Sequence, residues 1–117
     1  LGDAVVAGPL LDRLMHHAHV VLTTGGTGLT PSDRTPEATR AVLDFEIPGI
    51  AEAIRGYGIA HGVPTAVLSR GLTGLAGHTL VVNLPGSPGG CRDGIAVLSH
   101  LLLHAVAQVR GGGHPQL

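Results

Sequence analysis

The apolar positions of this chain fall into two patterns, and each pattern predicts a different kind of element. Residues 4–17 place their larger apolar side chains on roughly one face of a helix, and Asp3 is a suitable N-cap for it. Residues 19–24, by contrast, form a short continuous apolar run that is rich in β-branched side chains and stops at Gly25. Such a run is typical of a buried strand.

The middle of the chain repeats this alternation. Residues 35–45 predict a helix with Thr35 as its N-cap and Pro36 in the first helical position. A second short helix is expected over residues 47–60, ending close to its last glycines. Residues 64–70 then favour a strand or another extended segment.

The last third of the chain contains one more strand and one more helix. A glycine-rich loop over residues 71–78 leads into an apolar strand over residues 79–85. Apolar positions at helical spacing then predict one long final helix that runs to residue 110. The glycines from Gly111 end this helix, and we expect the tail 111–117 to be mobile.

Strands that alternate with helices predict an α/β domain whose sheet is mostly parallel, with helices on both faces. The 117 residues suit one domain with a real core, and no internal repeat is visible. In such a sheet the carboxyl ends of the strands meet at one edge, where α/β proteins bind their ligands. The loops that follow the strands are therefore the segments to examine for chemistry.

Composition excludes several classes of function. The chain has seven arginines, no lysine and eight acids, so its net charge is near zero and favours neither nucleic acid nor a membrane surface. A single cysteine excludes an internal disulfide and agrees with a reducing cytoplasm. No signal peptide or membrane-spanning run is visible. Because the chain starts at Leu1 and not at a methionine, we expect it to begin inside a longer domain.

The glycine cluster after the first strand predicts a phosphate site. Glycines let backbone N–H groups approach a ligand closely, and N–H groups exposed in this way suit an anion. A Walker A loop is excluded because the chain has no lysine. The dinucleotide fingerprint also fails, because counting from Gly26 puts Pro31 where the third glycine should be. A tight glycine turn that binds nothing remains the alternative.

A second cluster of glycine and proline, residues 83–90, strengthens the phosphate hypothesis. It too follows an apolar strand and opens a helix, with Ser87 as a good N-cap and Pro88 in the first turn. Two such junctions at one edge of a parallel sheet could together hold a polyphosphate. Asp33 lies close to the first loop, and a carboxylate beside a phosphate implies a cation such as Mg²⁺ between them. Alternatively, Asp33 only caps a turn.

The order of these motifs resembles a known family. "TTGGTG", "DRTPEAT", "IPGIAEAIR", "LSRG" and "NLPGSPGG" together are similar to the MoaB/Mog family of molybdopterin-binding proteins, which includes molybdopterin adenylyltransferase and the G domain of gephyrin. The resemblance runs from about Ala4 to Pro115. It implies a three-layer α/β fold, usually trimeric, that acts in molybdenum cofactor biosynthesis. The adenylyltransferase members join the terminal phosphate of molybdopterin to AMP from ATP, with Mg²⁺, and release pyrophosphate.

The resemblance also implies roles for particular residues. Asp33 matches the acidic residue that family members need for catalysis and would be a Mg²⁺ ligand. Independently of the resemblance, the charge of the phosphates favours a contribution from Arg70 or Arg34 beside the backbone donors. The alternative for Arg34 is a solvated turn residue. The segments that match the phosphate and pterin pocket are Thr24, Gly25, Gly26, Thr27 and Gly28, then Ser69 and Arg70, and then Pro85, Gly86 and Ser87.

The chain departs from the family at its front. Family members begin with a further strand and helix, and then a strand that ends in a Pro-Asp pair with a second functional acid. These elements are absent here, so the domain is expected to be incomplete at its N-terminus; Asp3 lies near the place of that acid. The alternative to an enzyme is therefore a molybdopterin-binding or oligomeric scaffold protein without activity. A pyrophosphate hydrolase-like domain is a third hypothesis.

The expected partners follow from the same resemblance. They are molybdopterin, ATP, further copies of the chain in a homotrimer and, downstream, a molybdenum-insertion enzyme; no nucleic acid or membrane is expected. The final helix agrees with self-association because Leu101 and Leu103 fall outside its main apolar stripe. A surplus apolar face on a small domain commonly marks an interface.

Overall fold

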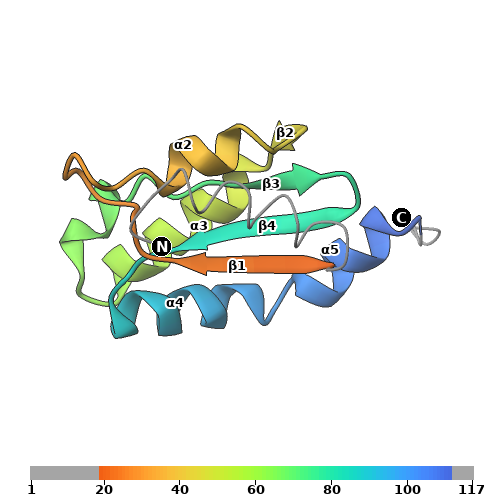
Figure 1. Ribbon diagram of the computed structural model, residues 1–117. Helices are drawn as coiled ribbons and strands as arrows, with labels where there is room; N and C mark the ends of the chain where they lie inside the picture. The colour runs from red at the N-terminus through yellow and green to blue at the C-terminus, as the bar shows by residue number, and fades with distance from the viewer. Residues whose placement is uncertain (1–18, 112–117) are drawn as a thin grey trace.

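The computed structural model describes residues 19–111, so the predicted helix 4–17, its cap Asp3 and the tail 112–117 lie outside the described residues. Within that range, helices pack around a four-stranded sheet (Figure 1). In chain order the elements are β1 (Val20–Thr24), α2 (Thr35–Arg40), β2 (Phe45–Glu46), α3 (Pro48–Ala60), the 3-10 helix η1 (Pro64–Leu68), β3 (Thr73–Ala76), β4 (Thr79–Leu84), α4 (Pro88–Leu98) and α5 (Leu102–Val109).

The strands lie in the order β1-β4-β3-β2. β1 pairs parallel with β4, from Val20 opposite Leu80 to Thr24 opposite Leu84, so both strands end at the same edge of the sheet. β3 pairs antiparallel with β4, and the short β2 pairs antiparallel with β3. The predicted α/β class and the parallel pairing at the two glycine-rich junctions are confirmed. Within the described residues the sheet contains both parallel and antiparallel pairs.

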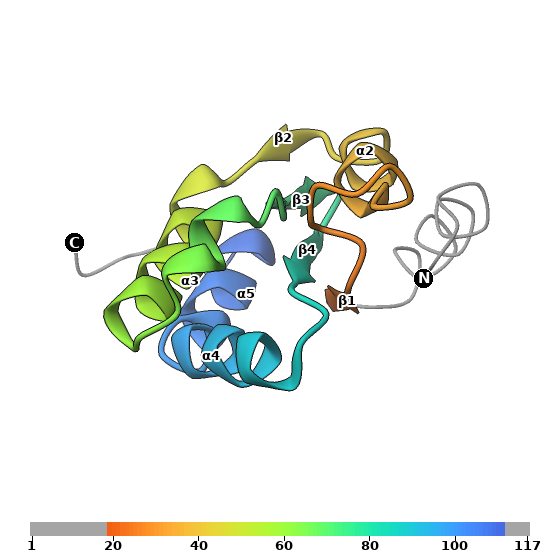
Figure 2. The same ribbon diagram turned by 90° about the vertical axis from the view of Figure 1, so that its left-hand side faces the viewer.

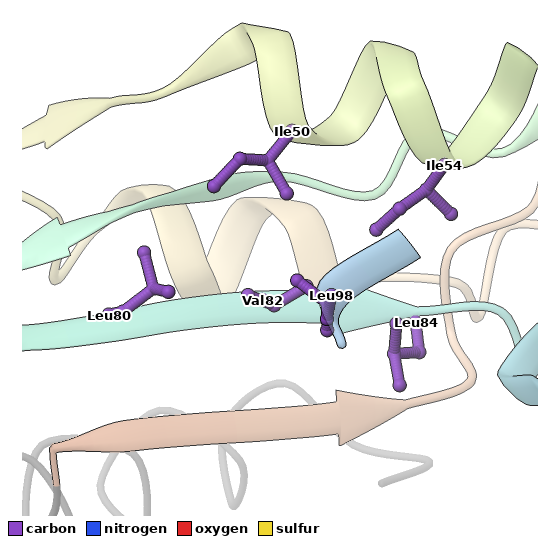
Figure 3. Close-up of a cluster of buried hydrophobic side chains, with 6 residues drawn as sticks. All are labelled: Ile50, Ile54, Leu80, Val82, Leu84 and Leu98. Atoms are coloured by element: carbon purple, nitrogen blue, oxygen red, sulfur yellow. The ribbon is translucent and has the colours of Figure 1, made fainter. Parts of the chain in front are cut away.

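Helices cover both faces of this sheet, as the prediction required (Figure 2). Helices α3, α4 and α5 pack on one face, and α2 lies on the other. Successive residues of β4 point to opposite faces, and burying each large side chain contributes roughly 1.5–3 kcal/mol. The smaller cluster, on the α2 side, contains Val21, Ala76 and Val81, with Leu43 against them. The main cluster joins Ile50 and Ile54 of α3, Leu80, Val82 and Leu84 of β4, and Leu98 of α4 (Figure 3).

One polar side chain joins the segments that carry the predicted site. Asn83 is 4% exposed near the end of β4, and its Nδ2 donates to Thr23 Oγ1 at 2.9 Å and to Thr39 Oγ1 at 3.0 Å. Its Oδ1 accepts from the N–H of Leu72 at 3.0 Å. A buried amide is costly unless it is paired. Asn83 therefore fixes the ends of β1 and β4 relative to α2 and to the segment before β3.

The helix predicted over residues 35–45 is shorter than expected. Thr35 is its first helical residue and not its N-cap, a position that Arg34 occupies without a side-chain bond, and α2 ends at Arg40. The chain leaves the helix because its backbone pairs with β3 instead. The N–H of Asp44 donates to Leu75 O at 2.7 Å, and Phe45 and its neighbour Glu46 form β2.

Two further expectations need correction in the segment between α3 and β4. Residues 64–68, expected to be extended, form the 3-10 helix η1, and extended backbone begins only at Ser69. The glycine-rich segment expected to be a loop contains β3. Its glycine is a packing requirement, because a methyl group at Gly74 would overlap the carbonyl oxygen of Phe45 in the neighbouring strand.

The final helix is two helices. Ser87 caps α4 as predicted, its Oγ accepting from the N–H of Gly90 at 3.0 Å. After α4, the hydroxyl of Ser99 donates to Ala96 O at 2.8 Å, and the backbone at Leu101 leaves the helical region before α5 begins. Local bonds of this kind compete with the helical ladder. No described helix, the separated α4 and α5 included, is long and apolar enough to cross a membrane.

The contact at Gly74 gives a test of the β2–β3 pairing. We expect Gly74→Ala to destabilise the fold by about 1–3 kcal/mol, because the added methyl has no space beside backbone atoms that cannot rotate away. The matched control is Gly56→Ala in α3, where an added Cβ meets nothing within 4 Å. It should stabilise by about 0.5–1 kcal/mol through helix propensity. Denaturant unfolding measures the free energy of unfolding of both variants. If Gly74→Ala is as stable as Gly56→Ala, the close packing of β3 against β2 is contradicted.

Candidate phosphate and ring-binding site

A cavity of about 450 Å³ opens at the carboxyl ends of β1 and β4. Its walls come from the two glycine-rich turns that follow these strands, from α3 and η1, and from the first turns of α4. Among the residues predicted from the sequence, Thr24, Arg34 and Arg70 are not part of the wall, and Asp3 is outside the described residues. The predicted residues that line the cavity are Gly25, Gly26, Thr27, Gly28, Asp33, Ser69, Pro85, Gly86 and Ser87.

The first glycine turn has a backbone that only glycine adopts easily. Gly25 and Gly26 have φ values of +83° and +71°, in the left-handed region. The N–H of Gly25 donates to Leu84 O at 3.0 Å, which continues the pairing of β1 with β4. A Cβ at Gly86 would lie 3.1 Å from the Cα of Gly25, so the two turns pack backbone against backbone. The two glycine clusters seen in the sequence thus form one structure.

Several carbonyl groups of this turn accept hydrogen bonds, whereas several of its N–H groups have no partner among the described residues. Gly26 O accepts from the N–H of Thr35 at 3.1 Å, and Thr27 O accepts from the N–H of Arg70 at 2.7 Å. Within residues 19–111, the N–H groups of Gly26, Thr27 and Gly28 have no hydrogen-bond partner. Three neighbouring donors that lack a partner beside a cavity suit the oxygens of an anion.

Arg70 binds the outside of the loop instead of lining the cavity. Its Nε donates to Gly28 O at 2.9 Å, and one of its terminal nitrogens donates to Asp33 O at 2.7 Å. The other terminal nitrogen donates to Glu37 Oε2 at 2.7 Å. One guanidinium therefore joins the two ends of the segment from Gly28 to Asp33 and anchors both to α2. Each donor of the planar fork has a separate acceptor, which a lysine ammonium could not reproduce.

The pairing of Arg70 with Glu37 affects the charge state of both groups. The hydrogen bond from Arg70 is the main cause that holds the pKa of Glu37 below its ordinary value of 4.5. The same bond raises the pKa of Arg70 above its ordinary value. Both side chains are more than a third exposed, so solvent screens the pair. Its importance lies in the geometry it imposes on the loop.

Asp33 closes a turn, which is one of the two roles left open by the sequence, and it also lines the cavity. Its Oδ2 accepts from the N–H of Thr30 at 3.1 Å and from the hydroxyl of Thr30 at 2.6 Å, which closes the turn before α2. The same carboxylate lines the cavity, and a Cβ at Gly28 would lie 2.8 Å from its Oδ2. Its Oδ1 has no hydrogen bond within the described part of the chain. One oxygen thus holds the turn while the other is available to a ligand or cation.

Two charged residues of the wall were missed by sequence reasoning. Arg55 of α3 lines the cavity, and its terminal nitrogen donates to Ser69 O at 3.3 Å and to Gly71 O at 3.2 Å. Asp93 of α4 also lines the cavity. The sequence could have indicated Asp93, because it follows Gly89 by four residues and Gly90 by three in a predicted helix. Residues at these spacings share one helix face.

The acidic residues of the wall bear on metal binding. No group of three or more His, Cys, Asp or Glu side chains that could hold a metal exists among residues 19–111. Mg²⁺ does not require such a group, because it commonly binds one or two carboxylates together with substrate phosphates and water. The free oxygen of Asp33, beside three N–H groups that suit phosphate, fits that mode of binding.

These features define a class: an α/β domain with a cavity, lined by two glycine turns, at the carboxyl ends of two parallel strands. Comparison with known proteins identifies the family. Residues 4–105 match the family model described as "Probable molybdopterin binding domain", and the chain belongs to this family.

Individual relatives agree with that assignment. The chain is 49% identical over 87 residues to the molybdenum cofactor synthesis protein cinnamon of Drosophila melanogaster, covering 74% of the chain and 14% of cinnamon. It is 51% identical over 70 residues to the molybdopterin adenylyltransferase of Haemophilus influenzae, covering 60% of the chain and 35% of that enzyme. The chain thus spans about a third or less of the length of these two relatives.

Solved structures share the fold closely. The molybdopterin biosynthesis Mog protein from Mycobacterium ulcerans is 54% identical and superposes with a TM-score of 0.86, over 89% of this chain and 68% of that protein. The resemblance to the MoaB/Mog family that the sequence motifs indicated is therefore confirmed.

The link between Arg70 and Glu37 predicts a pH dependence of stability. Because the pKa of Glu37 is lowered by folding, its contribution is present above the ordinary value of 4.5 and is lost as the pH falls through the lowered value. We expect Glu37→Gln to have a lower melting temperature than the parent from neutral pH down to about pH 5. Below the ordinary value of 4.5 the difference should shrink, because the protonated carboxyl then resembles the amide.

The control for this prediction is Glu46→Gln. Glu46 pairs with Arg40 at 3.4 Å, and both side chains are exposed, so its loss should change the melting temperature little at any pH. Thermal melts of the parent and both variants between acidic and neutral pH measure how each difference in melting temperature depends on pH. A Glu37→Gln difference that does not change with pH would contradict the assigned role of the carboxylate.

Proposed function

We propose that this domain acts in molybdenum cofactor biosynthesis as a molybdopterin adenylyltransferase, which transfers AMP from ATP to the terminal phosphate of molybdopterin. The observation that carries the proposal is the row of N–H groups from Gly26 to Gly28, unpaired within residues 19–111, in residues that line the same cavity as Asp33. Relatives named molybdopterin adenylyltransferase and the family membership support the same reaction.

The reaction suits a site with few titrating groups. An oxygen of the molybdopterin phosphate, already ionised at neutral pH, attacks the α-phosphorus of ATP. A new P–O bond forms, the bond from the α-phosphorus to the bridging β-oxygen breaks, and pyrophosphate leaves with that electron pair. No proton must be removed, so the domain contributes placement and charge neutralisation.

Charge neutralisation falls to three groups of this chain. The N–H groups of the first glycine turn and the N-terminal end of α4 donate to phosphate oxygens. Arg55 supplies a positive charge at the cavity wall, whereas Arg70 and Arg34 lie outside it. A Mg²⁺ ion bound at Asp33 would supply the remaining charge between the two anions.

The rings of the substrates would lie against aliphatic surface. Phe45 is 57% exposed in β2, and Tyr57 stacks on His61 with ring centroids 3.9 Å apart. Neither aromatic side chain lines the cavity. Most of the apolar wall comes from α3, η1 and the cap residue of η1, and these members are Ala51, Ile54, Val63, Ala66 and Leu68.

Asp33→Asn separates catalysis from binding. The amide oxygen can still accept from the Thr30 N–H, so the turn should survive, but the charge that holds Mg²⁺ is lost. We expect AMP transfer to fall by roughly 10²–10³-fold or more, while molybdopterin affinity is unchanged or slightly higher. The matched control is Asp44→Asn, whose carboxylate accepts from the Gly77 N–H at 2.6 Å and does not line the cavity. Normal turnover in Asp33→Asn would overturn the catalytic role of Asp33 and leave it only the role of closing the turn. No AMP transfer by the parent would favour the scaffold alternative.

We also propose that the domain works as a homotrimer in the cytoplasm and passes its product to a molybdenum-insertion enzyme. The predicted surplus apolar face is only partly present, because Leu101 packs against the main core. Leu103, however, is 90% exposed on α5, and Ile95 is 45% exposed on α4. Exposed apolar side chains on neighbouring helices suit contact with another copy.

Light scattering at micromolar concentration tests this assembly. We expect a mass of three chains for the parent and a smaller mass for Leu103→Glu, because a charge cannot be buried in an apolar contact without a partner. Val67→Glu is the control, since Val67 is 60% exposed on η1, a different element. A parent that remains monomeric would contradict the trimer.

A further inference from the structure

Asp93 is the one carboxylate of the cavity wall that no internal bond explains. It lies in the second turn of α4, lines the cavity and is half-buried. Within residues 19–111 it has neither a hydrogen bond nor an ion pair. Asp33, by contrast, uses one of its oxygens to close a turn. A carboxylate that gives up hydration at a cavity wall without a protein partner is suited to accept hydrogen bonds from a ligand.

The surroundings of Asp93 suit a flat ring. α3 packs beside α4, and a Cβ at Gly58 would lie 4.0 Å from Asp93 Oδ2 and 2.8 Å from the Cβ of Ala66. The missing side chain at Gly58 therefore leaves the carboxylate open toward the aliphatic wall formed with Ile54 and Ala66. Gly25 and Gly86, which approach each other closely, belong to the wall of the same cavity.

We propose that Asp93 determines ring specificity by accepting two N–H bonds from the 2-amino-4-oxopyrimidine edge of the pterin. This proposal rests on the function proposed above. The edge carries the 2-amino group and the ring N3–H side by side, and a carboxylate can accept from such a fork with both oxygens. Adenine offers an amino group beside a ring nitrogen that is an acceptor, so the same carboxylate would repel it.

This assignment gives the pterin ring and the phosphates different parts of the cavity. The pterin edge is read by Asp93 on α4, and the phosphates are held by main-chain donors of the glycine turns. A site built to hydrogen-bond a donor edge rejects analogues that lack it, because its polar groups are then left unpaired. The competing role for Asp93 is a second Mg²⁺ ligand beside Asp33, and the two roles predict different losses.

The test compares two fluorescent probes that differ at the 2-position: 6-hydroxymethylpterin, and the lumazine with an oxo group in place of the 2-amino group. We expect the parent to bind the pterin roughly 10–100-fold more tightly than the lumazine, as for hydrogen bonds to a charged group. Asp93→Asn should lose this preference through weaker pterin binding, with Mg-ATP affinity unchanged. Asp93→Ala should show the same loss, and Glu52→Gln, an exposed carboxylate on α3 outside the cavity, should lose nothing.

Equal pterin binding by the parent and Asp93→Asn overturns the role of Asp93 and leaves the proposed function standing. Loss of Mg-ATP affinity with pterin affinity retained overturns it in favour of the metal role. A parent that binds neither pterin nor molybdopterin overturns the proposed function and this inference together. Mg-ATP affinity retained in a variant also shows that the variant is folded.

Discussion

The buried amide of Asn83 is the constraint on which the site depends. β4 is otherwise an apolar strand in the middle of the sheet, and an amide buried there is stable only if its donors and acceptor are all paired. Thr23, Thr39 and the backbone of Leu72 supply the partners, and they come from β1, α2 and the segment before β3. One polar residue thus requires three distant segments to meet at the point where the two parallel strands end.

The arrangement at that edge follows from this meeting point. Because β1 and β4 end together, their glycine turns touch at Gly25 and Gly86, and the residues of both turns line one cavity. The charged side chains nearby divide into those that organise the loop and those that face the cavity. Arg70 and Glu37 are in the first group, and Arg55 and Asp93 are in the second. Residue type alone does not distinguish the two groups, since each holds one arginine and one acid.

Sequence reasoning predicted what depends on local pattern and missed what depends on distant pairing. The strands β1 and β4 and the helix α3 have strong apolar runs or periodicity, and the structure contains them. β3 was read as a loop because its glycine is disfavoured in isolated strands, whereas its reason is the close approach of Phe45. The glycine turns and Asp33 carried recognisable motifs. Arg70 was assigned to the cavity from its motif, but the positions of Gly28 O, Asp33 O and Glu37 place its guanidinium behind the loop.

The hydrogen bonds from Arg70 to Gly28 O and Asp33 O affect how fast and how tightly a ligand binds. A flexible loop would lose conformational entropy when it closes on a phosphate, and that loss would be subtracted from the affinity. Here the segment is already held at both ends by one guanidinium and within by the Thr30–Asp33 bonds. The segment loses its conformational entropy during folding, so its N–H donors need no rearrangement when a phosphate binds. We therefore expect the backbone of this segment to change little between the free and the phosphate-bound protein.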